Sequence, residues 1–455
     1  MRKLERRAIL CLFLAFAMMA GVVFYVYQVV VDGGTWVASP VNQHLYTNGY
    51  ISTGTIYDRN GDLLLQNQSN GNKKFNGDSE IRRATVHTVG DKTGNILTAA
   101  NVAFADKLVG YNLLSGTFTI NNEDRKLYLT IDDEVCKAAY EALDGRDGTV
   151  GVYNYRTGEI ICMVSTPTYD PTDPPNLDDD DTSGTYINKF ISSVYVPGST
   201  FKLVTSAAAI ENMDYQNFSY DCDGSEQYGS AEVDTIRCTA AHGGVDFFSA
   251  LAKSCNGAFG KISMELGAGT LEKYTKKAGL MTSYSINGIK TTPGRFDFPN
   301  GTINLAWTGI GQFHDLVNPC SMMVYNGAIA NGGSAAVPRL IKKLEMPQGL
   351  PSPNSENSSM TDELIDPETA DILSDMMKNN VTSNYGESNY PGLDIYAKSG
   401  TAELSGAQKP HSWFVGFIKD NDHPYAFVVL VENGGYGSEA AGSVANTVLQ
   451  EAVDR

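Results

Sequence analysis

The sequence has little positive charge. It contains 34 Lys and Arg against 52 Asp and Glu, which gives a formal net charge of -18 at pH 7, and its pI is near 4.7. No tract rich in Lys or Arg occurs beyond the first seven residues. Most of such a surface would repel nucleic-acid phosphates, so a nucleic-acid partner is excluded.

Internal repeats are absent too, but one long apolar run is present. Residues 8–31 carry no charge and are about as long as a helix needs to be to cross a bilayer. The cationic residues 1–7 before it predict a cytoplasmic N-terminus and export of the rest. A cleaved signal peptide is the alternative, because Ala-Phe-Ala at 15–17 fits a cleavage site. Cutting there would leave residues 18–31 as a further apolar stretch, so we expect an uncleaved anchor.

The seven cysteines do not settle the redox compartment. Cys222 and Cys238 bracket a segment rich in Gly, Ser and Asp that is typical of a surface loop, so a disulfide between them is a candidate if their side is oxidising. A metal site with His242 as third ligand is the less favoured alternative, and no metal is expected. The other cysteines lie in the apolar run or among apolar neighbours, as buried thiols do: Cys11, Cys136, Cys162, Cys255 and Cys320.

The length of 455 residues leaves room for two or more domains, since 42% of the residues are hydrophobic and 19% are charged. After the anchor we expect a strand-rich N-terminal domain of pedestal or dimerisation type over residues 32–124. Nothing in it has the makings of a catalytic site. A larger mixed α/β domain is expected over residues 125–455, with helices in its middle and strands near its end.

Hydrophobic periodicity predicts the order of elements in the larger domain. A strand over residues 126–131 precedes a helix that Asp132 caps and that runs to Leu143. The region 245–266 has helical periodicity that we expect Gly257 to break. The remaining predicted elements are two strands within 148–166, helices over 201–210 and 303–331, strands over 395–398, 412–418 and 425–432, and a closing helix over 438–453.

A serine and a lysine stand at the start of one predicted helix. Pro197 and Gly198 break the backbone just before Ser199, and a helix-compatible run begins at Phe201. Lys202 falls on the same face of the first turn as the serine, where its amine can take the hydroxyl proton. The pair is a candidate nucleophile and base. Alone the signal is weak, because a capping serine followed by a solvated lysine explains the same residues.

Two further motifs follow the serine and the lysine in order. Ser254-Cys-Asn256 comes next, and Lys398-Ser-Gly-Thr401 follows on a predicted strand. Ser-x-x-Lys, Ser-x-Asn and Lys-Thr/Ser-Gly in this order form the constellation of penicillin-binding proteins and class A β-lactamases.

The chain resembles a class B penicillin-binding protein, a D,D-transpeptidase of peptidoglycan synthesis, over nearly everything after Gly54. It is most similar to the small PbpA-type members. Departures are mild: Val196 stands where the family often has a second proline, and Ser399 replaces the commoner threonine. Besides the three motifs, the segments that carry the similarity are 54–61, 129–132, 157–160, 242–243, 311–312 and 411–416.

The resemblance implies a transpeptidase domain of the penicillin-binding and serine β-lactamase type, with a central antiparallel sheet flanked by helices. Acyl transfer needs a deprotonated Ser199, and Lys202 is the expected base. Ser254 would relay a proton toward the leaving amine, and Asn256 would hold the substrate's amide. Lys398 would supply positive charge for a substrate carboxylate.

Other residues are expected to complete this site, without a cofactor. Backbone N–H groups of Ser199 and Thr401 would form an oxyanion hole. Gln312 would support the Ser254 loop, and Trp413 would either line the cleft or pack beneath it. The expected substrate-binding residues are Ser399, Gly400 and Thr401, the two hydroxyl groups acting as donors.

The resemblance also implies partners: peptidoglycan stem peptides ending in D-Ala-D-Ala, β-lactams as covalent inhibitors, the membrane, and a glycan polymerase of the SEDS family.

Among the alternative functions, a β-lactamase is disfavoured, because no Glu-x-x-Leu-Asn pattern that could supply a deacylating carboxylate lies between Asn256 and Lys398. A D,D-carboxypeptidase stays open. A catalytically silent wall-assembly scaffold or β-lactam sensor is a further alternative, which the intact motifs disfavour.

Overall fold

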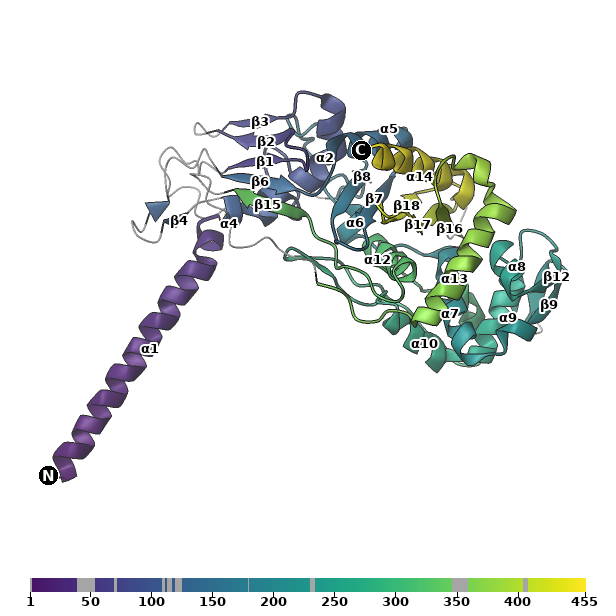
Figure 1. Ribbon diagram of the computed structural model, residues 1–455, viewed down its shortest axis with the longest axis horizontal. Helices are drawn as coiled ribbons and strands as arrows, with labels where there is room; N and C mark the ends of the chain where they lie inside the picture. Colours follow the sequence, from purple (N-terminus) through teal and green to yellow (C-terminus); the bar gives the residue numbers. More distant parts are fainter. Residues whose placement is uncertain are drawn as a thin grey trace.

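The computed structural model describes residues 2–38, 54–68, 72–108, 111–112, 117–118, 125–178, 180–229, 234–345, 359–403 and 408–455. A long helix, α1 (Arg2–Ala38), projects from one end of an elongated body (Figure 1). A small sheet lies at that end of the body, a larger sheet with its helices occupies the middle, and a mainly helical region forms the far end.

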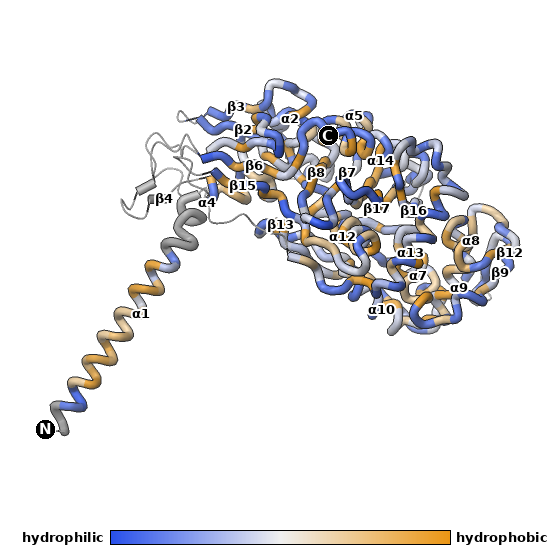
Figure 2. Tube along the Cα trace, viewed as in Figure 1, coloured by the Kyte–Doolittle hydropathy of each residue, from blue (hydrophilic) through white to orange (hydrophobic). Residues whose placement is uncertain are grey.

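Helix α1 is apolar along most of its length (Figure 2). Its segment Glu5–Gln28 is long and apolar enough to cross a bilayer, and the side chains of residues 5–27 are exposed. Exposed apolar side chains over such a length have no favourable place in water. The helix therefore fits a membrane anchor.

The smaller sheet has five strands in the order β15-β6-β1-β2-β3. The turn between β1 and β2 is held by Asp58, whose Oδ1 accepts the backbone N–H groups of Asn60, Gly61 and Asp62 at 2.7–2.8 Å. Gly61 supplies the positive φ, 101°, that this turn requires. The strands are β1 (Thr55–Tyr57), β2 (Leu63–Asn67), β3 (Lys73–Phe75), β6 (Lys126–Leu129) and β15 (Ile341–Glu345).

This sheet joins distant parts of the chain. β6 pairs in parallel with β1, and β15 pairs antiparallel with β6. Two of the five strands thus come from beyond residue 124, where we expect the N-terminal domain to end. That boundary stays a prediction, but the sheet itself continues across it.

Helix α2 (Ser79–Val89) connects the smaller sheet to the rest of the body, packing against α5 (Asp133–Leu143) and β8 (Ile160–Thr166). Asp78 caps it by accepting the N–H of Glu80 at 2.8 Å. The Nε of Arg82 on this helix donates to Oδ1 of Asp170 at 3.1 Å. The remaining elements of this part are α3 (Ala100–Ala103), α4 (Ala105–Leu108), β4 (Tyr111–Asn112) and β5 (Thr117–Phe118).

The larger sheet is antiparallel throughout, in the order β16-β17-β18-β7-β8. Every residue of β18 and β8 is buried, which requires a covering layer on each face. Helices α5 (Asp133–Leu143) and α14 (Gly437–Asp454) form one layer, and α12 (Pro319–Ala330) packs against β7, β17 and β18. The strands are β7 (Gly148–Asn154), β8 (Ile160–Thr166), β16 (Ile395–Ala402), β17 (His411–Ile418) and β18 (Tyr425–Val431).

The helical region and its short hairpins complete the body. The helices are α6 (Lys189–Ser192), η3 (Gly198–Phe201), α7 (Lys202–Asn212), η4 (Tyr215–Asn217), α8 (Phe247–Ala252), α9 (Asn256–Leu266), α10 (Ala268–Lys277), α11 (Ile303–Gly309), α13 (Pro367–Asn380), η7 (Val381–Tyr385) and η8 (Glu387–Asn389). The paired strands are β9 (Ser219–Cys222) with β12 (Gly243–Asp246), β10 (Ser225–Gln227) with β11 (Thr235–Arg237), and β13 (Ser285–Ile286) with β14 (Ile289–Lys290).

One predicted helix break was misplaced. The region 245–266 was expected to break at Gly257, but α8 ends at Ala252 and α9 begins at Asn256. The break is at Ser254, which has a positive φ of 54°. Gly257 lies inside α9, where a Cβ would come within 2.4 Å of the Tyr220 hydroxyl, so close packing explains this glycine. The predicted cap at Asp132 is confirmed: its Oδ1 accepts the N–H of Val135 at 3.3 Å.

Candidate active site

Ser199 lies in the short 3-10 helix η3, directly before α7. The turn is packed closely against β16. Gly198 has a positive φ of 55°, and a Cβ there would come within 2.8 Å of the Thr401 carbonyl oxygen. Its N–H donates to the Gly311 carbonyl at 2.8 Å. Only glycine fits this position, which fixes the half-buried serine next to the end of the strand.

Lys202 is the first residue of α7 and is fully buried. Its Nζ donates to the Ser254 carbonyl oxygen at 2.7 Å, to Ser254 Oγ at 3.1 Å and to Asn256 Oδ1 at 2.7 Å. Burial lowers the pKa of this amine to about 7. The structure therefore brings the first and second motifs together around one amine that can lose its proton near neutral pH.

The second motif sits in the break between α8 and α9. The strained left-handed φ of Ser254 directs both its carbonyl and its hydroxyl toward Lys202. Asn256 is held from the other side, because its Nδ2 donates to the Arg237 carbonyl at 2.9 Å. With its two ends engaged, the Asn256 amide has a fixed orientation.

Lys398 reaches the same hydroxyl from β16. Its Nζ donates to Ser254 Oγ at 3.1 Å and to the Ser399 carbonyl at 2.8 Å. Burial, and then the nearby charge of Lys202, lower the pKa of Lys398 well below its ordinary value. Two ammonium groups are costly side by side in such a site. The positive charge expected of Lys398 is therefore favoured only when an anion lies close to it.

The third motif is aligned by its close contact with η3. A Cβ on Gly400 would come within 2.8 Å of Thr200 Cγ2 and 3.0 Å of the Pro197 carbonyl oxygen, so only glycine allows this approach. The Ser399 N–H donates to the Tyr385 hydroxyl at 2.8 Å, and the two hydroxyl groups lie 3.0 Å apart. Tyr385 was not expected at the site, and no motif in the sequence marks it.

A cavity of about 260 Å³ lies beside Ser199. Ser199, Asn256 and Thr401 line it, one residue from each of the three motifs, and Gln312 lies in the same wall. The other lining residues, which sequence reasoning did not select, are Thr235, Arg237, Trp307, Ile310 and Glu403.

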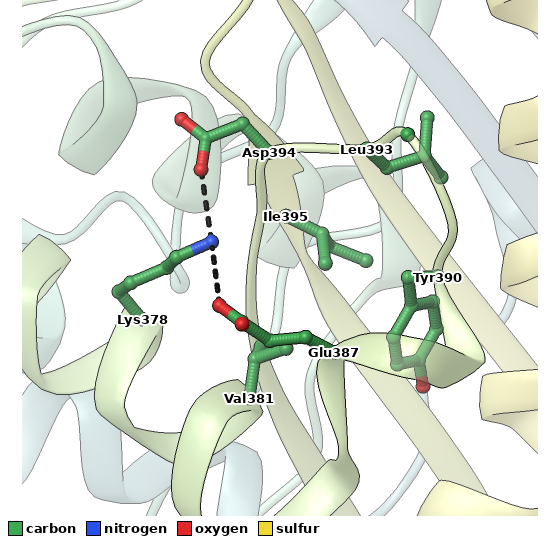
Figure 3. A pocket seen from close by; sticks show the side chains of 8 residues that line it. Lys378, Val381, Glu387, Tyr390, Leu393, Asp394 and Ile395 are labelled. Atoms are coloured by element: carbon green, nitrogen blue, oxygen red, sulfur yellow. Dashed lines mark hydrogen bonds and ion pairs between the residues drawn. The ribbon is translucent and has the colours of Figure 1, made fainter.

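A second pocket, of about 340 Å³, lies at the start of β16 (Figure 3). Lys378 points between Asp394 and Glu387 there, with nitrogen-to-oxygen distances of 2.9 Å and 3.4 Å. No member of the three motifs lines this pocket. Its lysine is neutralised by two carboxylates, as in an ordinary surface ion-pair network.

Of the two residues expected to support the site, Trp413 lies beneath the cleft and Gln312 lies in the cavity wall. Trp413 is fully buried beneath the loop that precedes Ser199, where its Nε1 donates to the Val196 carbonyl at 2.9 Å. Of the two expected placements, the structure has the tryptophan packed beneath the cleft. Gln312 lines the cavity, and its backbone N–H donates to the Trp307 carbonyl at 3.0 Å. Within the described residues its side chain makes no hydrogen bond to the Ser254 loop.

The candidate disulfide is not formed in the structure. Cys222 and Cys238 are free, and their sulfur atoms lie 3.7 Å apart, well beyond the bond length of about 2.05 Å. The two thiols belong to a larger cluster: the sulfur of Cys238 also lies 3.8 Å from that of Cys255, and the sulfur of Cys222 lies 3.5 Å from Nδ1 of His242. Cys255, the middle residue of the second motif, was expected to be a buried thiol, and it is buried within this cluster.

The arrangement can support acyl transfer. A half-buried serine begins a helix, a lysine with a lowered pKa lies in the first turn of that helix, and a second hydroxyl contacts two amines. Such a set provides a nucleophile, a base and a path for the proton. Gly198, directly before Ser199, comes close to the Thr401 carbonyl where η3 packs on β16, so the two residues expected to form the oxyanion hole lie in adjoining segments.

Comparison with known proteins gives consistent matches. The family model described as "Penicillin binding protein transpeptidase domain" matches residues 148–451, more than half of the chain. The peptidoglycan D,D-transpeptidase PbpA of Mycolicibacterium smegmatis is 29% identical over 346 residues, covering 69% of this chain and 68% of that protein. Stage V sporulation protein D of Bacillus subtilis is 28% identical over 354 residues, covering 73% and 53%.

Solved structures share the fold. Penicillin-binding protein A of M. tuberculosis, in an imipenem acyl-enzyme complex, superposes with a TM-score of 0.77 at 22% identity, covering 89% of this chain and 98% of that one. The D,D-transpeptidase domain from Eggerthella lenta gives 0.75 at 24% identity, covering 88% and 98%. The predicted fold class is confirmed: a strand-rich N-terminal part and a mixed α/β transpeptidase domain. By its transpeptidase domain, this chain belongs to the class B penicillin-binding proteins.

Proposed function

We propose that the chain is a peptidoglycan D,D-transpeptidase that cross-links stem peptides through an acyl-enzyme on Ser199. One observation carries the proposal: Ser254 Oγ lies 3.1 Å from both Lys202 Nζ and Lys398 Nζ, and Ser199, Asn256 and Thr401 of the same three motifs line one cavity. The three motifs thus share one hydrogen-bonded centre. Relatives named as peptidoglycan D,D-transpeptidases support the substrate class.

Acylation begins with the transfer of the Ser199 hydroxyl proton to the neutral amine of Lys202. The serine oxygen attacks the carbonyl carbon of the penultimate D-alanine, and the backbone N–H groups of Ser199 and Thr401 stabilise the oxyanion. When the tetrahedral intermediate collapses, the peptide bond breaks and the proton passes through Ser254 to the leaving amine. The terminal D-alanine departs, and its place is open for an acceptor.

Deacylation repeats these steps in reverse order. The amine of a neighbouring stem peptide attacks the ester carbonyl and gives a proton to the same relay. The bond between the carbonyl carbon and the Ser199 oxygen then breaks, the relay returns a proton to that oxygen, and a new peptide bond remains. Water in place of the amine would make the chain a D,D-carboxypeptidase. β-Lactams enter as covalent inhibitors because their strained amide acylates the same serine.

Labelling with a fluorescent penicillin tests the first step. The wild-type chain, kept in detergent, should give a fluorescent band that a competing unlabelled β-lactam abolishes, and Ser199→Ala should give none. Thr200→Ser is a matched control in the same turn, since it keeps the hydroxyl that donates to the Pro197 carbonyl at 2.8 Å. Equal labelling of wild type and Ser199→Ala would refute the proposed nucleophile.

A product analysis tests the second step. Incubation with a D-Ala-D-Ala donor peptide and an acceptor amine should yield the cross-linked dimer by mass spectrometry. If hydrolysed donor is the only product over a range of acceptor concentrations, the chain is a carboxypeptidase.

The proposed setting is the outer face of the cell membrane, with residues 1–7 in the cytoplasm and a SEDS-family glycan polymerase as neighbour. The apolar segment Glu5–Gln28 and the cationic residues before it support the orientation. Labelling of intact cells with a membrane-impermeant penicillin should succeed without lysis. Labelling only after lysis would place the catalytic domain on the inside.

A further inference from the structure

Four metal-ligating side chains converge next to the second motif. They are Cys222, Cys238, His242 and Cys255, and their ligand atoms all lie within 4.8 Å of one another. Two of the thiols are buried and the other two residues are half-buried. No carboxylate belongs to the set, so its chemistry is that of a soft thiolate and imidazole site.

The spacing of these atoms matches a tetrahedral zinc shell. Zn–S bonds of about 2.3 Å and Zn–N bonds of about 2.0–2.1 Å at tetrahedral angles place two sulfur ligands about 3.8 Å apart, and a sulfur and a nitrogen about 3.6 Å apart. The structure has 3.7 Å between the sulfurs of Cys222 and Cys238 and 3.8 Å between those of Cys238 and Cys255. The sulfur of Cys222 lies 3.5 Å from Nδ1 of His242.

The backbone holds each ligand independently of a metal. Cys222 ends β9 and pairs with Gly243 of β12, directly after His242. The N–H of Cys238, just after β11, donates to the Gly224 carbonyl at 2.9 Å. The N–H of Cys255 donates to the Ala250 carbonyl at 2.9 Å. Two hairpins and the start of α9 therefore deliver the four side chains to one point.

One sulfur also receives a backbone donor. The N–H of Gly257, in the first turn of α9, donates to the sulfur of Cys238 at 3.4 Å. A donor of this kind, at the positive end of a helix, stabilises a thiolate. Metal ligation needs that thiolate form, because Zn²⁺ binds Cys sulfur only after the proton has left.

We propose that Cys222, Cys238, His242 and Cys255 bind a zinc ion or a similar thiophilic divalent cation in a closed, structural Cys₃His site. Four protein ligands leave no open position, so the ion does no chemistry on substrate. Binding displaces the thiol protons to solvent. Its effect is mechanical: Cys255 stands between Ser254 and Asn256, whose side chains both contact Lys202 Nζ.

The site would therefore clamp the second motif in its working position. Ser254 holds a strained φ, and Asn256 is fixed to the carbonyl of Arg237, one residue before Cys238. A metal that ties Cys238 to Cys255 reinforces that same connection. The proposal rests on the proposed function only for this consequence, and metal binding itself can be measured without any activity.

Metal content is the direct test. The full chain, solubilised in detergent and purified without chelators, should contain about one zinc ion per chain when its metal content is measured by elemental mass spectrometry. Cys238→Ser and His242→Ala should fall to a small fraction of that value. Cys11→Ser removes a thiol of α1 outside the cluster and should keep the full content.

The absorption spectrum of bound Co²⁺ identifies the ligands of the site. A variant that exchanges one ligand for another should keep the metal, so its spectrum can be compared with that of wild type even if the variants that lose a ligand fold poorly. Wild type loaded with Co²⁺ should show thiolate-to-cobalt charge-transfer absorption together with the strong visible bands of a tetrahedral site. His242→Cys should keep the metal, and its charge-transfer absorption should become stronger because a fourth thiolate replaces the imidazole.

Two results would overturn the proposal. One is a wild-type chain, labelled normally by penicillin, that holds no metal although all its thiols are free. The other is a metal-free chain in which peptide mapping finds a disulfide within the cluster. If metal is present but its removal leaves the penicillin acylation rate unchanged, the site exists and the clamp on Ser254 is wrong.

Discussion

Lys202 and Lys398 share one hydrogen-bond partner, because the Nζ of each lies 3.1 Å from Oγ of Ser254. Two buried amines on either side of one hydroxyl cannot both hold their charge cheaply. A proton can therefore pass between Lys202, Ser254 and Lys398 when the carboxylate of a substrate enters the site. The predictions for both lysines start from this relationship.

The rate of acylation should follow the ionisation of Lys202. Burial lowers the pKa of this amine to about 7, and only its neutral form can accept the proton of Ser199. Penicillin labelling should therefore rise from about pH 5.5 to about pH 8.5, which is about one and a half pH units on each side of the midpoint near 7, and then level off. A rate that is flat between these limits would contradict a base with this pKa.

Replacing Lys202 tests the same role through the size of the loss in acylation rate. Lys202→Ala should slow acylation by about 100-fold to 10,000-fold, the usual contribution of a general base. Lys276→Ala is a suitable control, since this lysine is exposed and pairs with Glu272 on its own helix. It should leave the labelling rate unchanged.

Lys398 should act through the carboxylate of the substrate. Lys398→Met keeps most of the buried chain but removes the amine, so donors with a free C-terminal carboxylate should bind at least about 10-fold more weakly. A donor whose carboxylate is masked as a methyl ester should lose much less. Equal losses for the two donors, measured as KM and kcat separately, would show that Lys398 does not recognise the carboxylate.

The turn before Ser199 should tolerate no side chain at Gly198. Gly198→Ala combines a left-handed φ with a clash against the Thr401 carbonyl, so penicillin labelling should be almost abolished. Gly267→Ala is the matched control, because it has a φ of 75° but nothing within 4 Å of the added Cβ. Both variants should lose about 1–2 kcal/mol of stability from the backbone, but only the first should lose acylation.

Asp133 should make the chain less stable as the pH rises. Burial, together with the charges of Asp58 and Asp62, raises the pKa of its carboxyl to about 7. The folded chain thus keeps a proton that the unfolded chain releases near pH 4, and this preference is lost as pH climbs from about 4 to 7. Asp133→Asn should raise the Tm more at pH 8 than at pH 5.

A control separates this effect from a general loss of charge. Asp371 is an exposed carboxylate on α13, and Asp371→Asn should shift the Tm by a similar small amount at both pH values. If Asp133→Asn behaves in the same way, the raised pKa is wrong.

The order of the three motifs was readable from the sequence because each is a short local pattern with fixed spacing. The strands of the larger sheet were also predicted, since their apolar residues alternate or run continuously in short segments. The break at Ser254 was not, because a serine with positive φ leaves no compositional sign, whereas Gly257 does. Tertiary contacts decide which of the two residues bends the chain.

The contacts of Tyr385 and Cys255 were unpredictable for a related reason. Tyr385 approaches Ser399 from η7, and Cys255 meets Cys238 only because two hairpins fold over the start of α9. Pairings of this kind depend on how loops close in three dimensions, and residue spacing along the chain carries no record of them. The sequence also did not reveal that β6 and β15 extend the N-terminal sheet.

That shared sheet limits how the chain can be shortened. β6 lies between β1 and β15, so a chain that begins at residue 125 would lose its parallel partner and expose a row of unpaired N–H and C=O groups. An open edge of this kind recruits strands from other molecules. Removing the N-terminal part would therefore produce an aggregating catalytic domain, even though every proposed catalytic residue is still present.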